Sequence, residues 1–117
     1  MRFLMTYAND PSTPTTPEKM AEIGRFTQEM SKSGMLVMTG GLVRPNPGTK
    51  VRYTAGKFSV TDGPYAETKE LIDGFVVIDV KSKKDAFEMA ERFMRIAGDG
   101  EGEILQMFGP EDGPPPR

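Results

Sequence analysis

The stretch GFVVIDV, residues 74–80, decides the fold of this chain. Its run of large, mostly β-branched apolar residues predicts a central strand that is covered on both faces. Directly after it, Ser82 can cap a helix of about sixteen residues, and Gly98 is suited to end that helix. Apolar residues at helical spacing predict the buried stripe of this helix: Ala86, Met89, Ala90, Phe93, Ile96 and Ala97. We expect GDGEGE, residues 98–103, to be a turn, and Glu103–Phe108 to be the last strand.

An equivalent order of elements precedes this stretch. Residues 2–7 alternate in direction as a strand does. The Pro- and Thr-rich loop that follows leads into a helix over residues 17–33, which Thr16 can cap. Residues 35–44 read as a second strand, weakened by a pair of adjacent glycines that suggests a bulge or a close approach.

The segment VRYTAGKFSV, residues 51–60, predicts a β-hairpin that turns at Ala55-Gly56. Ala-Gly is a weak turn signal, so the register of the hairpin stays open. The order strand, helix, strand, hairpin, strand, helix, strand predicts a ferredoxin-like α+β fold, βαβ–(hairpin)–βαβ, with both helices on one sheet face. Residues 1–109 would form this single domain, and residues 110–117 a flexible Pro/Gly-rich tail.

The second face of the sheet also carries apolar side chains and needs a cover. A second copy of the chain is the simplest cover, which predicts a homodimer with a barrel-like α+β core. In the alternative, the hairpin folds over this face and the monomer suffices.

Composition excludes several function classes. The formal net charge is −2 and there is no basic stripe, so we expect no nucleic-acid partner. The chain has no cysteine and no histidine, which removes thiolate chemistry, zinc–thiolate sites and the commonest general base. We expect no cofactor and no metal, because the carboxylates lack a diagnostic ligand spacing. No apolar run is long enough to span a membrane and no signal peptide is evident, so we expect a cytoplasmic protein.

The segment VTDGPYAETKE, residues 60–70, resembles the signature of the YCII-related, DGPF-domain family. A strand of the GFVVIDV kind follows in that family too, and the order of elements matches over roughly residues 1–109. The aromatic residue here is Tyr65 in place of the usual phenylalanine. The resemblance implies a dimeric α+β barrel and little about chemistry. A paired histidine and aspartate suspected in related members cannot be carried over, because this chain has no histidine.

The same segment contains the candidate site residues Asp62, Tyr65 and Glu67. Asp62 could act as a base or orient a ligand, Tyr65 could donate a hydrogen bond, and Glu67 could be a second acid–base group. Each has a structural alternative: Asp62 as a turn former, Tyr65 as a packing residue, and Glu67 as part of a solvated loop.

Three functional hypotheses remain open. The chain could bind a small apolar or carbonyl-bearing ligand near the Asp-Gly-Pro turn. It could be a histidine-independent enzyme that uses Asp62 and its neighbours, in a pocket between sheet and helices, for proton transfer, isomerisation or cofactor-free oxidation. It could also be a structural or accessory dimer domain. The fold alone does not decide among them.

Overall fold

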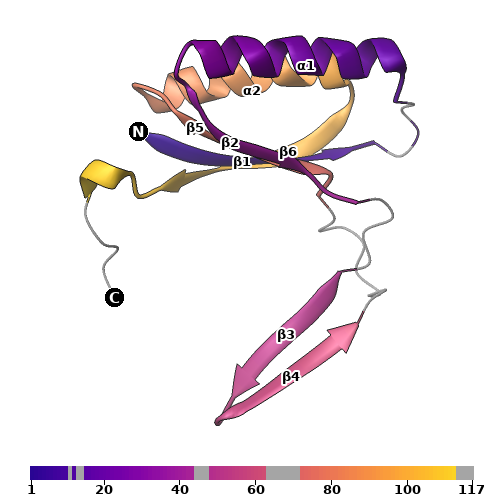
Figure 1. Ribbon diagram of the computed structural model, residues 1–117, viewed down its shortest axis with the longest axis vertical. Coiled ribbons are helices and arrows are strands. Elements are labelled where there is room, and N and C mark those ends of the chain that lie inside the picture. Colours follow the sequence, from indigo (N-terminus) through magenta and orange to yellow (C-terminus); the bar gives the residue numbers. More distant parts are fainter. Residues whose placement is uncertain (11, 13–14, 44–47, 63–71, 113–117) are drawn as a thin grey trace.

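The computed structural model describes residues 1–10, 12, 15–43, 48–62 and 72–112. The elements follow the predicted ferredoxin-like order, with the hairpin inserted between the two halves (Figure 1). They are β1 (Arg2–Asn9), α1 (Pro17–Lys32), β2 (Leu36–Gly41), β3 (Thr49–Thr54), β4 (Lys57–Asp62), β5 (Gly74–Asp79), α2 (Lys83–Ala97), β6 (Gly100–Met107) and a 3₁₀ turn, η2 (Pro110–Asp112).

The main sheet has four antiparallel strands in the order β2-β5-β1-β6. The predicted central strand, β5, pairs with β1 on one side and with β2 on the other. Both helices cover the same face of this sheet (Figure 1). The predicted α+β, ferredoxin-like fold is therefore confirmed. Along each strand, alternate side chains face the helices.

The hydrophobic core lies between the helices and the sheet. Phe3 of β1 stands opposite Ile78 of β5, and both side chains are almost completely buried. Helix α1 completes the core with Phe26 and Met30, and α2 with Ala86 and Met89 from its predicted apolar stripe. The helical and strand periodicities of the sequence thus converge on one interior.

The helix ends follow local chemistry. The Thr16 hydroxyl accepts a hydrogen bond from the Lys19 N–H at 3.1 Å, and the Ser82 hydroxyl accepts one from the Asp85 N–H at 3.2 Å. Each bond satisfies a backbone donor that the first helical turn leaves unpaired. Gly98 follows the last residue of α2 with φ at +98°, a conformation that favours glycine. These boundaries agree with the sequence prediction.

The last strand starts earlier than predicted, and its glycine-rich beginning is not a turn. Gly100 and Gly102 belong to β6 and stand opposite Asn9 and Tyr7 of β1. A Cβ atom at Gly102 would collide with the carbonyl oxygen of Thr6, so glycine lets the two backbones approach closely. The composition of GDGEGE predicts a turn, but pairing with β1 makes its residues 100–103 part of a strand.

The hairpin forms a sheet of its own, β3-β4, as predicted. Ala55 and Gly56 both have positive φ, at +51° and +78°, which is the backbone of a type I′ hairpin turn. The register left open by the sequence places Tyr53 opposite Phe58. Figure 1 shows the hairpin pointing away from the main sheet, so it does not fold across its own sheet face as the monomeric alternative required.

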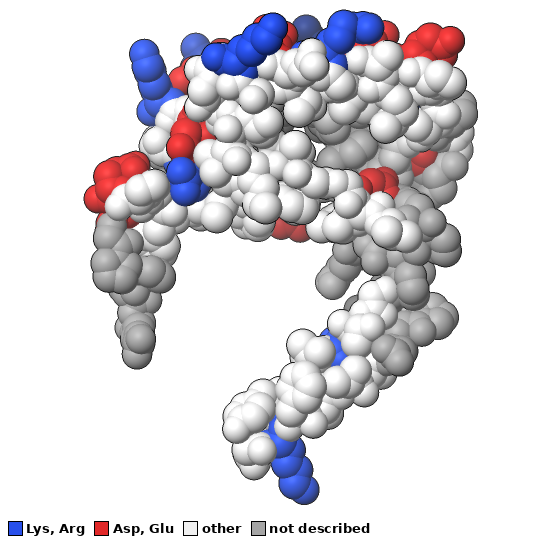
Figure 2. Space-filling view, viewed as in Figure 1, with Lys and Arg blue, Asp and Glu red and all other residues white. Residues whose placement is uncertain are grey.

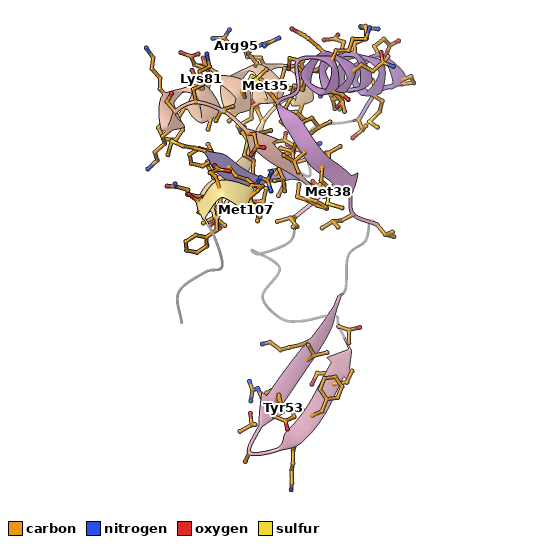
Figure 3. The ribbon with its side chains drawn as sticks, turned by 60° about the vertical axis from the view of Figure 1, so that its left-hand side comes forward. Met35, Met38, Tyr53, Lys81, Arg95 and Met107 are labelled. Carbon is orange, nitrogen blue, oxygen red and sulfur yellow. The ribbon has the colours of Figure 1, made fainter. Side chains whose placement is uncertain are left out.

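The sheet face opposite the helices carries an apolar row that crosses all four strands. The register brings Met38, Val77, Leu4 and Leu105 side by side. Met38 is 59% exposed and Leu105 is 48% exposed. Met38 and Met107 lie on the side of the sheet away from the helices (Figure 3). Charged side chains gather instead along the helical layer (Figure 2).

The end of the chain forms a short turn over Pro110–Asp112. The Gly109 N–H donates to the Asp112 carboxylate at 2.6 Å, and the Asp112 N–H donates to the Gly109 carbonyl at 3.0 Å. Residues 113–117 lie outside the described part, so the flexible tail stays a prediction beyond Asp112.

Candidate functional site

A cavity of about 820 Å³ lies between the main sheet and the two helices. Both helices and all four strands of the main sheet contribute to its lining. The apolar part of the lining includes Ile23, Phe26, Met30, Phe93, Met94 and Ile104. A concave, mostly apolar site of this size with a few polar groups is the usual form of a small-molecule site.

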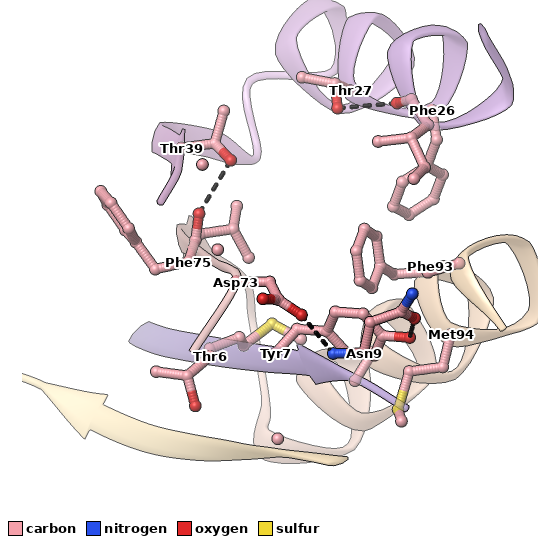
Figure 4. Close-up of a pocket in the computed structure, with 18 of the residues that line it drawn as sticks. Thr6, Tyr7, Asn9, Phe26, Thr27, Thr39, Asp73, Phe75, Phe93 and Met94 are labelled. Carbon is pink, nitrogen blue, oxygen red and sulfur yellow. Dashed lines mark hydrogen bonds between the residues drawn. The ribbon is translucent and has the colours of Figure 1, made fainter. Parts of the chain in front are cut away.

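Aromatic rings form one wall of the cavity. The rings of Tyr7 and Phe93 meet edge to face, with their centroids 5.1 Å apart. Phe26 packs against the same Phe93 ring at 6.5 Å in a tilted arrangement. Such contacts hold rings in defined positions, so this wall presents a fixed apolar surface to a ligand (Figure 4).

Asp73 supplies the carboxylate at the polar end of the cavity. Its backbone N–H donates to the Tyr7 carbonyl at 2.7 Å, and its own carbonyl accepts from the Leu42 N–H at 2.8 Å. Its carboxylate accepts a short hydrogen bond, 2.5 Å, from the Asn9 N–H (Figure 4). Asp73 therefore connects the start of β5 to β1 and to the end of β2, and its position depends on all three strands.

Tyr7 ties the end of β1 to the end of α2. Its hydroxyl lies 2.8 Å from the Asn9 side-chain oxygen and 2.9 Å from the Gly98 carbonyl. Burial, followed by the charges of Asp73 and other nearby aspartates, raises the pKa of Tyr7 above its ordinary value. The phenol therefore keeps its proton at neutral pH and acts through hydrogen bonds.

Four threonines are among the described lining residues, Thr6, Thr15, Thr27 and Thr39, and two of them donate to backbone carbonyls. Thr27 of α1 donates from its hydroxyl to the Ile23 carbonyl at 2.8 Å. Thr39 of β2 donates from its hydroxyl to the Phe75 carbonyl at 2.9 Å (Figure 4). The protons of both hydroxyls are directed at backbone carbonyls, so these side chains have lone pairs left to offer to a ligand.

The charged residues in the lining are predominantly acidic. Asp10 and Asp73 contribute carboxylates and Lys19 contributes an ammonium group, whereas the alternation of β6 directs the Glu103 side chain to the sheet face of Leu105. Hydrogen bonds from the Ser12 backbone and hydroxyl, at 2.9 and 2.8 Å, lower the pKa of Asp10. Asp10 is therefore ionised at neutral pH, and the described lining has a negative balance.

The predicted site residues are placed only in part. Asp62 is the last residue of β4, opposite Thr49. Tyr65 and Glu67 lie outside the described residues, and so does Gly63-Pro64 of the proposed turn. The assignment of Asp62, Tyr65 and Glu67 to a site therefore stays a prediction.

Sequence reasoning missed the polar residues that do line the cavity. Asp73 directly precedes the strongest predicted strand, and a carboxylate at the mouth of a buried strand was the available signal. Tyr7 continues the inward alternation of Phe3 and Met5, which hinted at its direction. Thr27 and Thr39 gave no comparable signal, because their neighbourhood arises from tertiary packing.

Two further results concern the described residues alone. Across the ranges given above, no group of three histidine, cysteine, aspartate or glutamate residues is arranged to hold a metal ion. In the same ranges, neither helix has the length and apolar character needed to cross a membrane.

Comparisons with known proteins bear on both fold and family. The sequence profile of the YCII-related domain matches residues 1–108. An uncharacterized protein of Rhizobium meliloti (strain 1021) is 34% identical over 71 residues, which are 61% of this chain and 57% of that relative. This chain therefore matches a little over half the length of that relative.

A solved structure has a similar fold at low sequence identity. It is a 5-chloro-2-hydroxyhydroquinone dehydrochlorinase from Burkholderia phenoliruptrix AC1100, in complex with 2,5-dihydroxybenzoquinone. The TM-score is 0.53 and the identity is 11%, over 95% of this chain and 97% of that one. At this identity the similarity concerns the fold alone.

Proposed function

Since this chain belongs to the YCII-related domain family, we propose that it binds a small apolar or carbonyl-bearing molecule in the cavity between its helices and its sheet. The main observation that supports this function is the cavity itself, which has an aromatic wall from Tyr7, Phe26 and Phe93 and a polar end at Asp73. Such a combination buries an apolar ring and orients it through a few polar contacts. A cytoplasmic location, expected from the sequence, is part of the same proposal.

The Asp-Gly-Pro turn enters the proposal through chain connectivity. β4 ends at Asp62, and the chain returns to the described part at Ile72 and Asp73, beside the cavity. The intervening segment contains Tyr65 and Glu67. We therefore keep Asp62, Tyr65 and Glu67 as candidate ligand contacts at this end of the cavity.

A solved protein of the same fold supports the ligand class. The dehydrochlorinase described above was determined with 2,5-dihydroxybenzoquinone, a small ring compound that carries carbonyl groups. A molecule of that size is compatible with a cavity of about 820 Å³.

A histidine-independent enzyme is the second candidate. The observation in its favour is the carboxylate of Asp73 at the polar end of an apolar cavity, because a partly desolvated carboxylate is a common general base. Asp62 and Glu67 would be further acid–base groups in this scheme. Turnover of the bound compound by the wild type, lost in Asp73→Asn and in Asp62→Ala, would distinguish catalysis from binding.

We also propose that the functional unit is a homodimer. The apolar row Met38, Val77, Leu4 and Leu105 lies on the face away from the helices, and its two ends, Met38 and Leu105, are 59% and 48% exposed, whereas Val77 is buried. The hairpin presents a second apolar surface, formed by Val51, Tyr53, Phe58 and Val60, all more than half exposed.

A second copy of the chain covers both surfaces in one arrangement. Within a single chain the hairpin points away from the open sheet face, so its two apolar surfaces do not cover each other (Figure 1). An isolated two-stranded hairpin is marginally stable in water, which favours its packing against another surface. A two-fold dimer in which each hairpin lies against the partner's sheet satisfies both requirements.

Mass spectrometry of small molecules released from the purified protein tests the binding function. We expect an apolar or carbonyl-bearing compound from the wild type and none from Thr27→Phe, which fills the cavity from α1. A compound retained at full occupancy by a folded Thr27→Phe protein would place the binding site elsewhere. Asp62→Ala tests the turn: unchanged affinity with unchanged stability would remove Asp62 from the site.

A further inference from the structure

We infer that the cavity selects ligands that donate hydrogen bonds, such as phenols and alcohols, and that Asp73 is the acceptor that recognises them. The inference rests on the proposed binding function and narrows its ligand class. A carbonyl compound would have to carry a hydroxyl or N–H group as well, and a carboxylate would be disfavoured.

The first argument comes from the protons of the hydroxyl groups in the cavity. The described lining has five hydroxyl residues, of which Tyr7, Thr27 and Thr39 belong to β1, α1 and β2. Each hydroxyl has a single proton. Those of Thr27 and Thr39 are donated to backbone carbonyls at 2.8 and 2.9 Å. That of Tyr7 is donated to one of two acceptors within 2.9 Å. These three hydroxyls therefore have only acceptor lone pairs to offer a ligand.

The second argument comes from Asp73. A carboxylate accepts hydrogen bonds through two oxygens with about four lone-pair directions, so Asp73 can accept from a ligand in addition to the interactions that it already makes, among them the hydrogen bond from the Asn9 N–H. Figure 4 shows the carboxylate at the cavity, across from the Phe93 ring. A hydrogen bond from a neutral ligand to a carboxylate is stronger than one between neutral partners.

The third argument concerns charge. Among the described lining residues on the helix side of the sheet, Lys19 is a cation, whereas Asp10 and Asp73 carry carboxylates. Lys19 lies in the first turn of α1. An anionic ligand would approach two negative charges and one positive charge, and its own desolvation would add to the cost. Neutral donors avoid both penalties.

Matched ligands separate these alternatives. We would measure the affinities of 1-naphthol, 1-methoxynaphthalene and 1-naphthoate, and repeat the series on biphenyl to allow for shape. The chain has no tryptophan, so the fluorescence of these probes has little protein background. We expect each hydroxyl compound to bind about tenfold more tightly than its methyl ether. The carboxylate should be the weakest ligand of each series.

Methionine methyl groups report where the probes bind. Met5, Met20, Met30, Met89 and Met94 line the cavity, whereas Met38 lies on the open sheet face. With [methyl-¹³C]methionine, the cavity methyl resonances should shift on titration and that of Met38 should not. Binding that shifts none of the cavity methyls, or that survives in a folded Thr27→Phe protein, would overturn the proposed function itself.

Variants then test the role of Asp73. Asp73→Asn should reduce hydroxyl-compound affinity about tenfold and change methyl-ether affinity little. Glu88→Gln removes the same charge from an exposed position of α2 outside the lining and should leave all affinities unchanged. Three results would refute the donor selectivity and leave the proposed binding function standing. The probes could bind in the cavity without a preference for the hydroxyl compound, the carboxylate could bind most tightly, or Asp73→Asn could leave the hydroxyl preference intact. If Asp73→Asn does not fold, the order of the three probe affinities for the wild type tests the donor selectivity by itself.

Discussion

Replacing the two aromatic residues of the hairpin should dissociate the proposed dimer without unfolding the monomer. Tyr53 and Phe58 form a cross-strand pair and are 73% and 67% exposed in the single chain. The double variant Tyr53→Ser/Phe58→Ser removes this apolar pair. The core between helices and sheet contains neither residue, so its packing should remain intact.

The magnitude follows from the exposed area. Complete burial of an aromatic side chain of this kind is worth about 1.5–3 kcal/mol, so the exposed share of each is worth about 1–2 kcal/mol. A two-fold dimer buries the pair on both copies, which gives four side chains and about 4–8 kcal/mol. The lower value alone raises the dissociation constant about a thousandfold.

Sedimentation velocity over a range of micromolar concentrations measures the effect. The wild type should sediment at twice the monomer mass, and the double variant as a monomer with unchanged circular dichroism. Arg52→Ser/Lys57→Ser is the matched control, because these side chains lie on the opposite face of the hairpin. A monomeric wild type, or a double variant with the wild-type dissociation constant, would refute the reasoning.

Three further predictions concern stability. Ile78→Ala, at a fully buried position of β5, should cost about 2–5 kcal/mol of unfolding free energy, and a urea titration showing a smaller loss would contradict the assigned core. Gly102→Ala should lower the melting temperature more than Glu101→Ala in the same strand, because only the new Cβ at residue 102 meets the carbonyl of the facing strand; equal losses would argue against that close approach. Hydrogen bonds from Arg2, at 2.8 and 2.9 Å, lower the pKa of Asp79. The stability that this pair contributes is therefore fully present above the ordinary aspartate pKa of about 3.9. It is lost as the pH falls through the lowered pKa of Asp79. The wild type should therefore melt above Asp79→Asn at pH 7 and converge with it in acid, and a difference that persists there would exclude the ion pair as its cause.

The sequence reveals the elements because their signals are local. GFVVIDV reads as a buried strand from composition alone, and Ser82 and Gly98 delimit the following helix through their own backbone chemistry. Ala55-Gly56 marks the hairpin turn, since the turn needs two residues with positive φ. The element order then leaves few topologies that obey the handedness of the crossovers.

The cavity and its polar groups belong to the tertiary structure. Tyr7, Thr27, Thr39 and Asp73 are far apart in the chain and belong to, or directly adjoin, four different elements, and only the packing of helices on the sheet turns them toward one space. The same holds for the glycine-rich start of β6, whose composition favours a turn until β1 lies beside it. Propensity and periodicity act over a few residues, whereas the contacts that shape a binding site join residues tens of positions apart, so the sequence by itself determined the elements and the tertiary structure decided the site.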